Sequence, residues 1–367
     1  MSPSSANINK TQTQKRVLVA PLDWGLGHAT RCVPLINALL AQGFEVLIAA
    51  EGSGAALLAQ EFPGLKILPI HGYNVRYSQG RQFFFLKMVF QSAKVSAAIK
   101  KENAWLIKAA EEHLIDIVIS DNRFGLYHKS LHCVFMTHQL FIKTGNSITE
   151  KIAQKINYHY ISRFNECWVP DHPGADNLAG ELSHPGKMPP VPVKYIGALS
   201  RFIKNDAEKN TDVLAIVSGP EPQRSLFEEI LRKQLNIPGK KNVLVRGLPG
   251  KIITRKGSCE NPVLIDHLPA SELNKLALSA KIVIARSGYS SVMDLAALQQ
   301  KAILIPTPGQ AEQEYLAGYL SQKKYCIAVA QEVLDLRNIL PAAGETELQP
   351  FTTGSGALLK AAISSLV

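Results

Sequence analysis

The sequence predicts two Rossmann-like, doubly wound α/β domains that face each other across a cleft. Three observations support this fold class. The chain has 367 residues, enough for about two domains of roughly 100–200 residues each. Short apolar runs rich in β-branched residues alternate with longer amphipathic stretches. A Pro/Gly-rich stretch at 183–202 interrupts this alternation, which then restarts.

In the first half, the short apolar runs are the expected strands. Their near-continuous hydrophobicity is typical of parallel strands that are covered on both faces. The runs are Arg16–Ala20, Phe44–Ala50, Lys66–Ile70, Ile115–Ser120, His132–Met136 and Glu166–Pro170. Amphipathic stretches between them, Cys32–Gln42 and Ser92–Glu112, are expected helices.

The second half repeats this pattern after the Pro/Gly-rich linker. Its expected strands are Val213–Ser218, Asn242–Arg246, Val263–Ile265, Ile282–Ala285, Ala302–Pro306 and Cys326–Val329. We place one domain at residues 15–195 and the other at 196–350. Residues 351–367 are expected to form a C-terminal helix that packs back toward the first domain.

The composition restricts the partners and the compartment. A formal net charge of +10 favours anionic ligands, but the basic residues do not form one run with interleaved aromatics, so we expect no nucleic-acid binding. Five scattered cysteines without metal-ligand spacing indicate reduced thiols in a cytoplasmic protein. The polar leader does not resemble a signal peptide, and no apolar run is long enough to span a bilayer.

The first expected strand leads into a turn that contains Gly25 and Gly27, and a helix is expected to begin near His28. Two glycines allow a tight turn and a close approach of the backbone to a ligand. Open α/β sheets bind ligands beyond the carboxyl ends of their strands, so His28 is expected at such a site. Thr30 replaces the third glycine of a dinucleotide fingerprint, which argues against a nicotinamide or flavin cofactor. An ordinary strand-to-helix turn is the alternative.

The second half carries a richer motif, because polar residues follow two consecutive strands. The strand Ile282–Ala285 ends in Arg-Ser-Gly, and the next helix is expected to begin near Tyr289. The free N–H groups of a helix N-terminus can hold a diphosphate without a metal. Further candidates are Ser290 in the first turn, Asp294 as an acceptor from a ribose diol, and Gln313 and Glu314 after the next strand.

Other loops that follow strands supply weaker candidates. The loop SGPEPQR contains Arg224, which could face the cleft, although an ordinary exposed loop is equally compatible. In the first half, Asn122 and the pair His138–Gln139 are acceptor-side candidates. The basic amphipathic segment 81–101 could lie on an anionic membrane surface, with a core helix as the alternative.

The motifs RSGYSSVMD (residues 286–294) and GLGHATRC (residues 25–32) resemble glycosyltransferase family 28, whose best-known member adds N-acetylglucosamine to lipid-linked muramyl-pentapeptide. The resemblance covers the whole chain and is clearest at 285–318. It implies the GT-B fold, with an acceptor-side N-terminal domain and a nucleotide-sugar-binding C-terminal domain. It also implies that no cofactor is needed beyond the UDP-sugar substrate.

The resemblance assigns donor-binding positions to this chain. It implies that Ser287, Gly288 and Tyr289 line the phosphates and that Gln313 and Glu314 contact the sugar. The remaining donor-side positions that it implies are Gly27, Arg201, Gly219, Arg224, His267, Leu268, Arg286, Ser290 and Asp294. Asp294 and Glu314 replace a family glutamate and glutamine, which puts N-acetylglucosamine specificity in doubt.

We therefore expect an inverting, metal-independent transfer of a hexose or N-acetylhexosamine from a UDP-sugar to an acceptor hydroxyl, on a glycan or a lipid-linked molecule. His28 is the candidate base because its ordinary pKa is near neutrality. Asp23 and Asp121 are the reserves, and either could orient His28. The GLGHATRC stretch also resembles UDP-sugar hydrolases, so a hydrolase or epimerase is an alternative. A non-catalytic anion-binding protein is a third.

Overall fold

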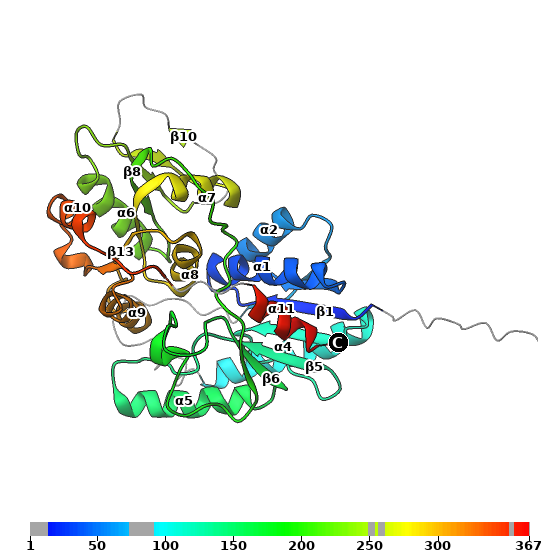
Figure 1. Ribbon diagram of the computed structural model, residues 1–367. Helices are drawn as coiled ribbons and strands as arrows, with labels where there is room; N and C mark the ends of the chain where they lie inside the picture. Colours follow the sequence, from blue (N-terminus) through cyan, green and yellow to red (C-terminus); the bar gives the residue numbers. More distant parts are fainter. Residues whose placement is uncertain (1–13, 73–91, 249–253, 256–260, 352–355, 367) are drawn as a thin grey trace, which may run out of the picture.

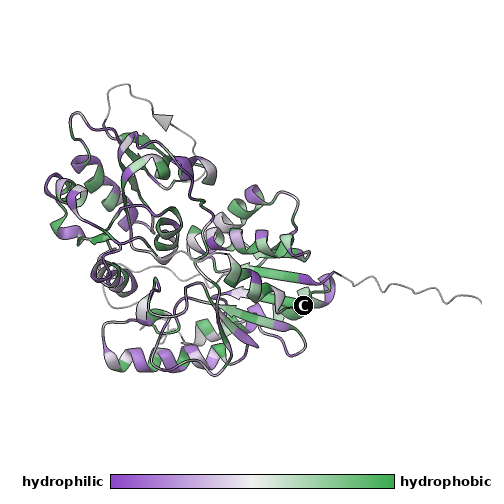
Figure 2. Cartoon of the chain, viewed as in Figure 1, coloured by the Kyte–Doolittle hydropathy of each residue, from purple (hydrophilic) through white to green (hydrophobic). Residues whose placement is uncertain are grey.

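The computed structural model describes residues 14–72, 92–248, 254–255, 261–351 and 356–366. In this part of the chain, the sequence folds into two α/β halves, each built on a predominantly parallel sheet (Figure 1). The predicted fold class is confirmed. Apolar strands lie inside each half, and the polar residues gather on the outer helices and loops (Figure 2).

The first sheet is entirely parallel. Its order across the sheet is β3 (Ile67–Pro69), β2 (Glu45–Ala50), β1 (Arg16–Pro21), β4 (Ile117–Asp121), β5 (His132–Met136), β6 (Glu166–Val169) and β7 (Val193–Tyr195). The described helices of this half are α1 (Leu26–Ala41), α2 (Gly52–Glu61), α4 (Ser92–His113), α5 (Ser147–Ile161) and the 3₁₀ helix η1 (Gly180–Leu182). β7 lies within the stretch that we expected to be irregular, because residues 193–195 pair with residues 167–169 of β6.

The second sheet also has seven strands, and six of them repeat the order of β3 to β6 in the first sheet; the seventh, β10, lies at the opposite edge from β7. The order is β10 (Thr254–Arg255), β11 (Val263–Ile265), β9 (Asn242–Val245), β8 (Thr211–Ile216), β12 (Ala280–Ala285), β13 (Ala302–Leu304) and β14 (Ile327–Ala328). β10 is antiparallel to β11. The described helices are α6 (Gln223–Gln234), α7 (Ala270–Ser279), α8 (Tyr289–Leu298), α9 (Ala311–Gln322), η2 (Gln331–Val333), α10 (Leu336–Glu345) and α11 (Ala357–Ser364).

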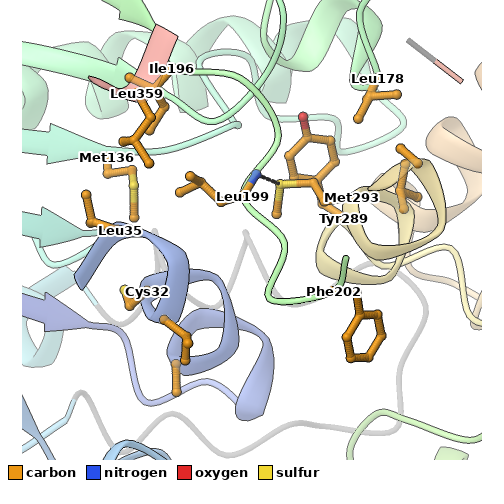
Figure 3. Close-up of a cluster of buried hydrophobic side chains, with 14 of the residues drawn as sticks. Cys32, Leu35, Met136, Leu178, Ile196, Leu199, Phe202, Tyr289, Met293 and Leu359 are labelled. Carbon is orange, nitrogen blue, oxygen red and sulfur yellow. Dashed lines mark hydrogen bonds between the residues drawn. The ribbon is translucent and has the colours of Figure 1, made fainter. Parts of the chain in front are cut away.

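A continuous apolar core joins the two halves. Figure 3 shows Leu199 of the linker between Met136 of β5 and Met293 of α8. The backbone N–H of Leu199 donates to Met293 Sδ at 3.3 Å. The linker is therefore packed between the halves, and the strand ends of both sheets meet in a defined arrangement.

The C-terminal helix α11 belongs to the second half in sequence but packs on the first (Figure 1). It contacts α1 and β7. Lys15 Nζ donates to the carbonyl of Leu366 at 2.9 Å, and Ser364 Oγ donates to Gln42 Oε1 at 2.9 Å. The chain thus crosses back and attaches the second half to the first at a second place.

Candidate active site

The site begins where the strand order of each sheet reverses. β1 lies between β2 and β4, and its last residue, Pro21, pairs with Asp121 at the end of β4. In the second half, β8 lies between β9 and β12 in the same way. Connections leave in opposite directions at such a point, so the loops separate and leave room for a ligand. The topology therefore places the turns after β1, β4, β8 and β12 at the two ligand-binding edges.

A sharp turn places His28 at the first of these edges. Gly25 has a φ of 81°, in the left-handed region that favours glycine, and α1 begins at the next residue. His28 therefore lies in the first turn of α1. Its Nδ1 is 3.0 Å from Oδ2 of Asp121, and the side chain of Asp121 is fully buried. Helix α1 and strand β4 thus hold an imidazole and a carboxylate in contact.

Arg31, one helical turn after His28, holds the same carboxylate. Its Nε donates to Asp121 Oδ2 at 2.8 Å, and its Nη2 donates to Oδ1. Burial alone would raise the pKa of Asp121, but Arg31 and His28 hold that pKa well below its ordinary range. Asp121 therefore stays ionised. Burial lowers the pKa of His28, and the positive charge of Arg31 adds to this effect against the opposing charge of Asp121.

A neutral His28 contacting a carboxylate through Nδ1 has a defined chemistry. If Nδ1 carries the proton and donates to Asp121, the lone pair of Nε2 is free to accept a proton. The side chain of His28 is 16% exposed, so a hydroxyl group could approach it. His28 and Asp121 together can therefore act as a general base with an orienting carboxylate.

His138 connects this cluster to the second half. Its Nδ1 is 3.3 Å from Arg31 Nη1, and its Nε2 is 2.8 Å from Oε1 of Glu312 in the first turn of α9. The imidazole is stacked on the ring of Tyr289, with 4.2 Å between ring centroids and 8° between planes. An acceptor-side candidate thus lies directly against the donor-side half.

The first turns of α1 and α8 also meet. Ser290 Oγ donates to the carbonyl of Gly27 at 3.1 Å. A Cβ on Gly27 would lie 2.8 Å from that hydroxyl oxygen, so the hydroxyl would have to turn away and lose this hydrogen bond. The N-cap Gly288 of α8 provides no side-chain hydrogen bond to this helix terminus. The N-terminus of α8, which favours anions, therefore lies beside the turn that carries His28.

Asp294 lies one turn further into α8, beside the linker. Its Oδ1 accepts a hydrogen bond from Ser200 Oγ at 2.6 Å. Burial raises its pKa to about 6, against the lowering effects of that hydrogen bond and of the charge of Arg201. Burial also lowers the pKa of His267, and the charge of Arg201 adds to this effect. The structure therefore brings three predicted donor-side residues, Asp294, Arg201 and His267, into one neighbourhood.

Comparisons with known proteins agree with this geometry. Residues 254–357 match the model of the glycosyltransferase family 28 C-terminal domain, and residues 16–146 match the model of glycosyl transferase family 1. The chain is 24% identical over 330 residues, 86% of each chain, to the UDP-N-acetylglucosamine–N-acetylmuramyl-(pentapeptide) pyrophosphoryl-undecaprenol N-acetylglucosamine transferase of Clostridium botulinum. It is 22% identical to an uncharacterized glycosyltransferase of Methanosarcina acetivorans, over 82% of each chain.

Solved structures show the same fold. The spinosyn rhamnosyltransferase SpnG has a TM-score of 0.61 and 17% identity, and the match covers 96% of this chain and 95% of that one. Acinetobacter baumannii MurG has a TM-score of 0.53 and 13% identity, with 96% and 94% covered. The chain is a GT-B glycosyltransferase. The expected resemblance to family 28 is confirmed.

Within the glycosyltransferase, some predicted site residues serve the protein interior instead. Arg224 was expected to face the cleft. Its Nε donates to Glu221 Oε1 at 2.6 Å, and its Nη1 donates to Glu228 Oε2 at 2.8 Å and to the carbonyl of Arg246 at 3.0 Å. These bonds hold the Arg224 guanidinium within the second half, and a role of Arg224 in donor binding stays a prediction.

Arg286 and its neighbours are also turned inward. The Arg286 guanidinium lies 3.8 Å from the ring centroid of Phe227 and donates to the carbonyl of Pro306 at 3.0 Å, while burial lowers its pKa to about 10. Ser287 Oγ donates to the carbonyl of Gln313 at 2.8 Å. Tyr289 Oη donates to the carbonyl of Pro170 at 2.8 Å. These side-chain contacts hold the turn before α8 in place.

The acidic residue that reaches the site is Glu312, which the sequence reasoning missed. Glu314, the predicted sugar contact, is exposed and accepts a hydrogen bond from the backbone N–H of Gly309 at 2.8 Å. Gln313 closes the same loop by accepting from the backbone N–H of Thr307 at 2.9 Å. The periodicity of α9 contains the signal: Glu312 lies four residues before the buried Leu316, on the same helix face.

The remaining candidates lie around this centre. Asp23 does not contact His28 through any described bond; its Oδ1 is 4.0 Å from Arg123 Nη2, and burial raises its pKa. Asn122 follows Asp121 with a φ of 58°, and its Nδ2 donates to Asp121 Oδ1 at 3.5 Å. Gln139 is half-buried, and its backbone N–H donates to Thr137 Oγ1 at 3.0 Å.

Two further donor-side candidates lie in loops that follow strands of the second sheet. Gly219 follows β8 with a φ of 110°, a conformation that favours glycine. Leu268, after β11, packs against the core that joins the halves. Most of the basic segment 81–101, namely residues 81–91, lies outside the described residues. In the described part, no helix is long and apolar enough to cross a membrane.

Proposed function

We propose that this glycosyltransferase moves a hexose or N-acetylhexosamine from a UDP-sugar to an acceptor hydroxyl, with inversion and without a metal. The observation that carries the proposal is the contact of His28 with Asp121, 3.0 Å apart, beside the N-terminus of α8. The imidazole supplies a base, and the helix terminus supplies positive potential for the diphosphate. His28 belongs to the first half and α8 to the second. The acceptor and the UDP-sugar would therefore bind between the two halves.

The mechanism follows from the charges. His28 Nε2 accepts the proton of the acceptor hydroxyl as the oxygen attacks the anomeric carbon. The bond from that carbon to the diphosphate oxygen breaks, and the electron pair leaves with UDP. The first-turn N–H groups of α8 and the guanidinium of Arg201 stabilise the developing negative charge. Asp121 stabilises the imidazolium that forms on His28.

The acceptor is proposed by analogy with the relatives. The Clostridium botulinum relative is named for a pyrophosphoryl-undecaprenol acceptor. The +10 charge of this chain suits a phosphorylated acceptor on an anionic membrane surface. We therefore propose a lipid-linked or cell-envelope glycan acceptor, reached from the cytoplasmic face through peripheral contact.

The test measures release of UDP from a panel of UDP-sugars, with and without membrane lipid extract. Acceptor-dependent release is expected for a transferase. Release of UDP in water without an acceptor would instead identify a hydrolase, the alternative that the resemblance of the GLGHATRC stretch suggested. Equal inactivity with every UDP-sugar, alongside activity with another nucleotide-sugar, would contradict the uridine donor.

The role of His28 is tested in the same assay. His28→Gln retains a polar side chain but supplies no base, so turnover should fall by about 10²–10⁴-fold while UDP binding persists. Asp121→Asn should also lower turnover, because the charge that orients and stabilises the imidazole is lost. His159→Gln, on the exposed face of α5, is the matched control and should behave like wild type. Near-wild-type turnover of His28→Gln at unchanged melting temperature would exclude His28 as the base.

A further inference from the structure

The arginine one turn after His28 is a buried charge that the mechanism above does not use. We propose that Arg31 is a positioning residue, which fixes the Asp121 carboxylate and keeps the neighbouring His28 in its neutral, base-competent form. The inference rests on the proposed function only in calling His28 the base. The contacts that support it are independent of the substrate.

Arg31 leaves the Asp121 carboxylate little freedom to rotate. Its Nε and Nη2 donate to the two different oxygens of Asp121, which is the two-pronged arrangement that a planar guanidinium favours. The side chains are 2% and 0% exposed. A carboxylate held at both oxygens presents one fixed edge to Nδ1 of His28.

The same guanidinium opposes a positive charge on His28. Arg31 Nη2 is 2.9 Å from His28 Nδ1. A protonated imidazole would therefore place a second cation against the guanidinium in a site largely shielded from water, where Coulomb repulsion is stronger than in bulk solvent. Burial and Arg31 both lower the pKa of His28, while Asp121 opposes them.

Arg31 is in turn held from the second half. Its Nη1 is 3.3 Å from Nδ1 of His138, whose Nε2 is 2.8 Å from Glu312 Oε1. The tautomer of His138 with its proton on Nε2 satisfies both contacts, because it accepts from Arg31 and donates to Glu312. Among the described residues, the titratable or charged groups around His28 are Asp121 from β4, Arg31 and Cys32 from α1, His138 from the loop after β5 and Glu312 from α9. Ser290 of α8, which meets Gly27, is uncharged.

The test is a histidine ¹⁵N NMR titration of the intact protein without substrate, with His28→Gln identifying the His28 resonances. In the wild type, His28 should titrate below the ordinary value of about 6.5. Arg31→Gln removes the charge, so the His28 midpoint should rise by about one pH unit, while Arg31→Lys should keep it near wild type. The nitrogen shifts should also show the proton on Nδ1 in the wild type, donated to Asp121. A proton on Nε2, with Nδ1 accepting from Arg31 Nη2, would leave Nε2 without a lone pair and would overturn the base-competent form.

A purely structural arginine would change the melting temperature of both variants and leave the His28 midpoint unmoved, which would overturn the proposal. A wild-type midpoint at or above the ordinary value would overturn it too, and this measurement does not depend on any Arg31 variant folding. If the titrations come out as expected and no UDP-sugar is turned over, the proposed function fails while the role of Arg31 stands. If transfer is found, the acid limb of the kcat/KM profile should follow the same shift.

Discussion

At the scale of single residues, the buried Asp121 and the partly buried Asp294 show how hydrogen-bond partners set the charge of a carboxyl group. Asp121 accepts bonds from a guanidinium, and its pKa is held well below the ordinary range. Asp294 has one hydroxyl partner, Ser200, and burial raises its pKa to about 6. Both lie near the same interface, so the difference follows from the charge of the hydrogen-bond donor and not from depth alone. The contacts of Asp121 stabilise its ionised form, whereas ionisation of Asp294 lowers the free energy of unfolding.

Asp294 should therefore make stability depend on pH. Its folded pKa is raised above 3.8, so its contribution is fully present below about pH 4 and is lost as pH rises through about 6. Asp294→Asn does not titrate, so its free energy of unfolding relative to wild type should improve between pH 4 and pH 7, by about 2–3 kcal/mol. Urea unfolding at pH 4.5 and 7.5 measures the difference. Asp206→Asn, at an exposed aspartate between the linker and β8, is the control. An equal response of both variants would contradict the raised pKa.

At the scale of elements, helix α9 of the second half is hydrogen-bonded to the segment around η1 of the first half. The backbone N–H of Glu181 donates to Tyr315 Oη at 2.7 Å, and Tyr319 Oη donates to Asn177 Oδ1 at 3.0 Å. Gly180 has a φ of 55°, and a Cβ there would collide with Tyr315 Oη. The close approach thus needs glycine twice, for its backbone conformation and for its missing side chain. Glu312 is on the same helix, so this contact between α9 and the η1 segment helps to fix the distance between Glu312 and His138.

Gly180→Ala should weaken the contact between α9 and the η1 segment. We expect a loss of about 1–3 kcal/mol in the free energy of unfolding, from overpacking and backbone strain. Tyr315→Phe removes the colliding oxygen, so the same glycine change should cost less in that background. Gly186→Ala, in open space, should stay within about 0.5 kcal/mol of wild type. Strict additivity of the double variant would show that Gly180 and Tyr315 do not share a contact.

At the scale of the whole molecule, the halves are joined by a shared core and by the return of α11. The buried face of α11 contributes Leu359, Ala362 and Ile363 to the core that also contains α1 and α8 residues. The linker and α11 therefore attach the second half to the first at two separate places. This double attachment restricts how the strand ends of the two sheets can separate.

Ile363→Ala tests that attachment. Ile363 is fully buried, so the truncation should cost about 2–5 kcal/mol through lost burial and a residual cavity. Lys360→Ala changes an exposed residue of the same helix and should be nearly neutral. Chemical denaturation of both variants measures the difference. Equal stability of the two would mean that α11 is peripheral to the fold.

The sequence alone determined the fold class, most strand positions and the place of His28 at the end of the first strand. These features depend on local hydrophobic periodicity and turn-forming glycines, which are legible in a short stretch of chain. The sequence offered two carboxylates that could orient His28, Asp23 and Asp121, and it did not distinguish between them. Only the pairing of β1 with β4 brings Asp121 to His28 and leaves Asp23 beside Arg123.

Tertiary structure alone decided which charged side chains face the site. Arg224 and Arg286 follow the expected strands, yet they bond inside the second half. Arg31 and Glu312 both reach His138 from distant segments. Buried charges need a complementary partner. Arg224 has its partners three and four residues away, at helical spacing. The partners of Asp121 and His138 lie about a hundred residues or more away, so spacing does not reveal them. Local sequence patterns therefore specify the strands and helices of this glycosyltransferase, and long-range ion pairs between them determine which charged groups form the site.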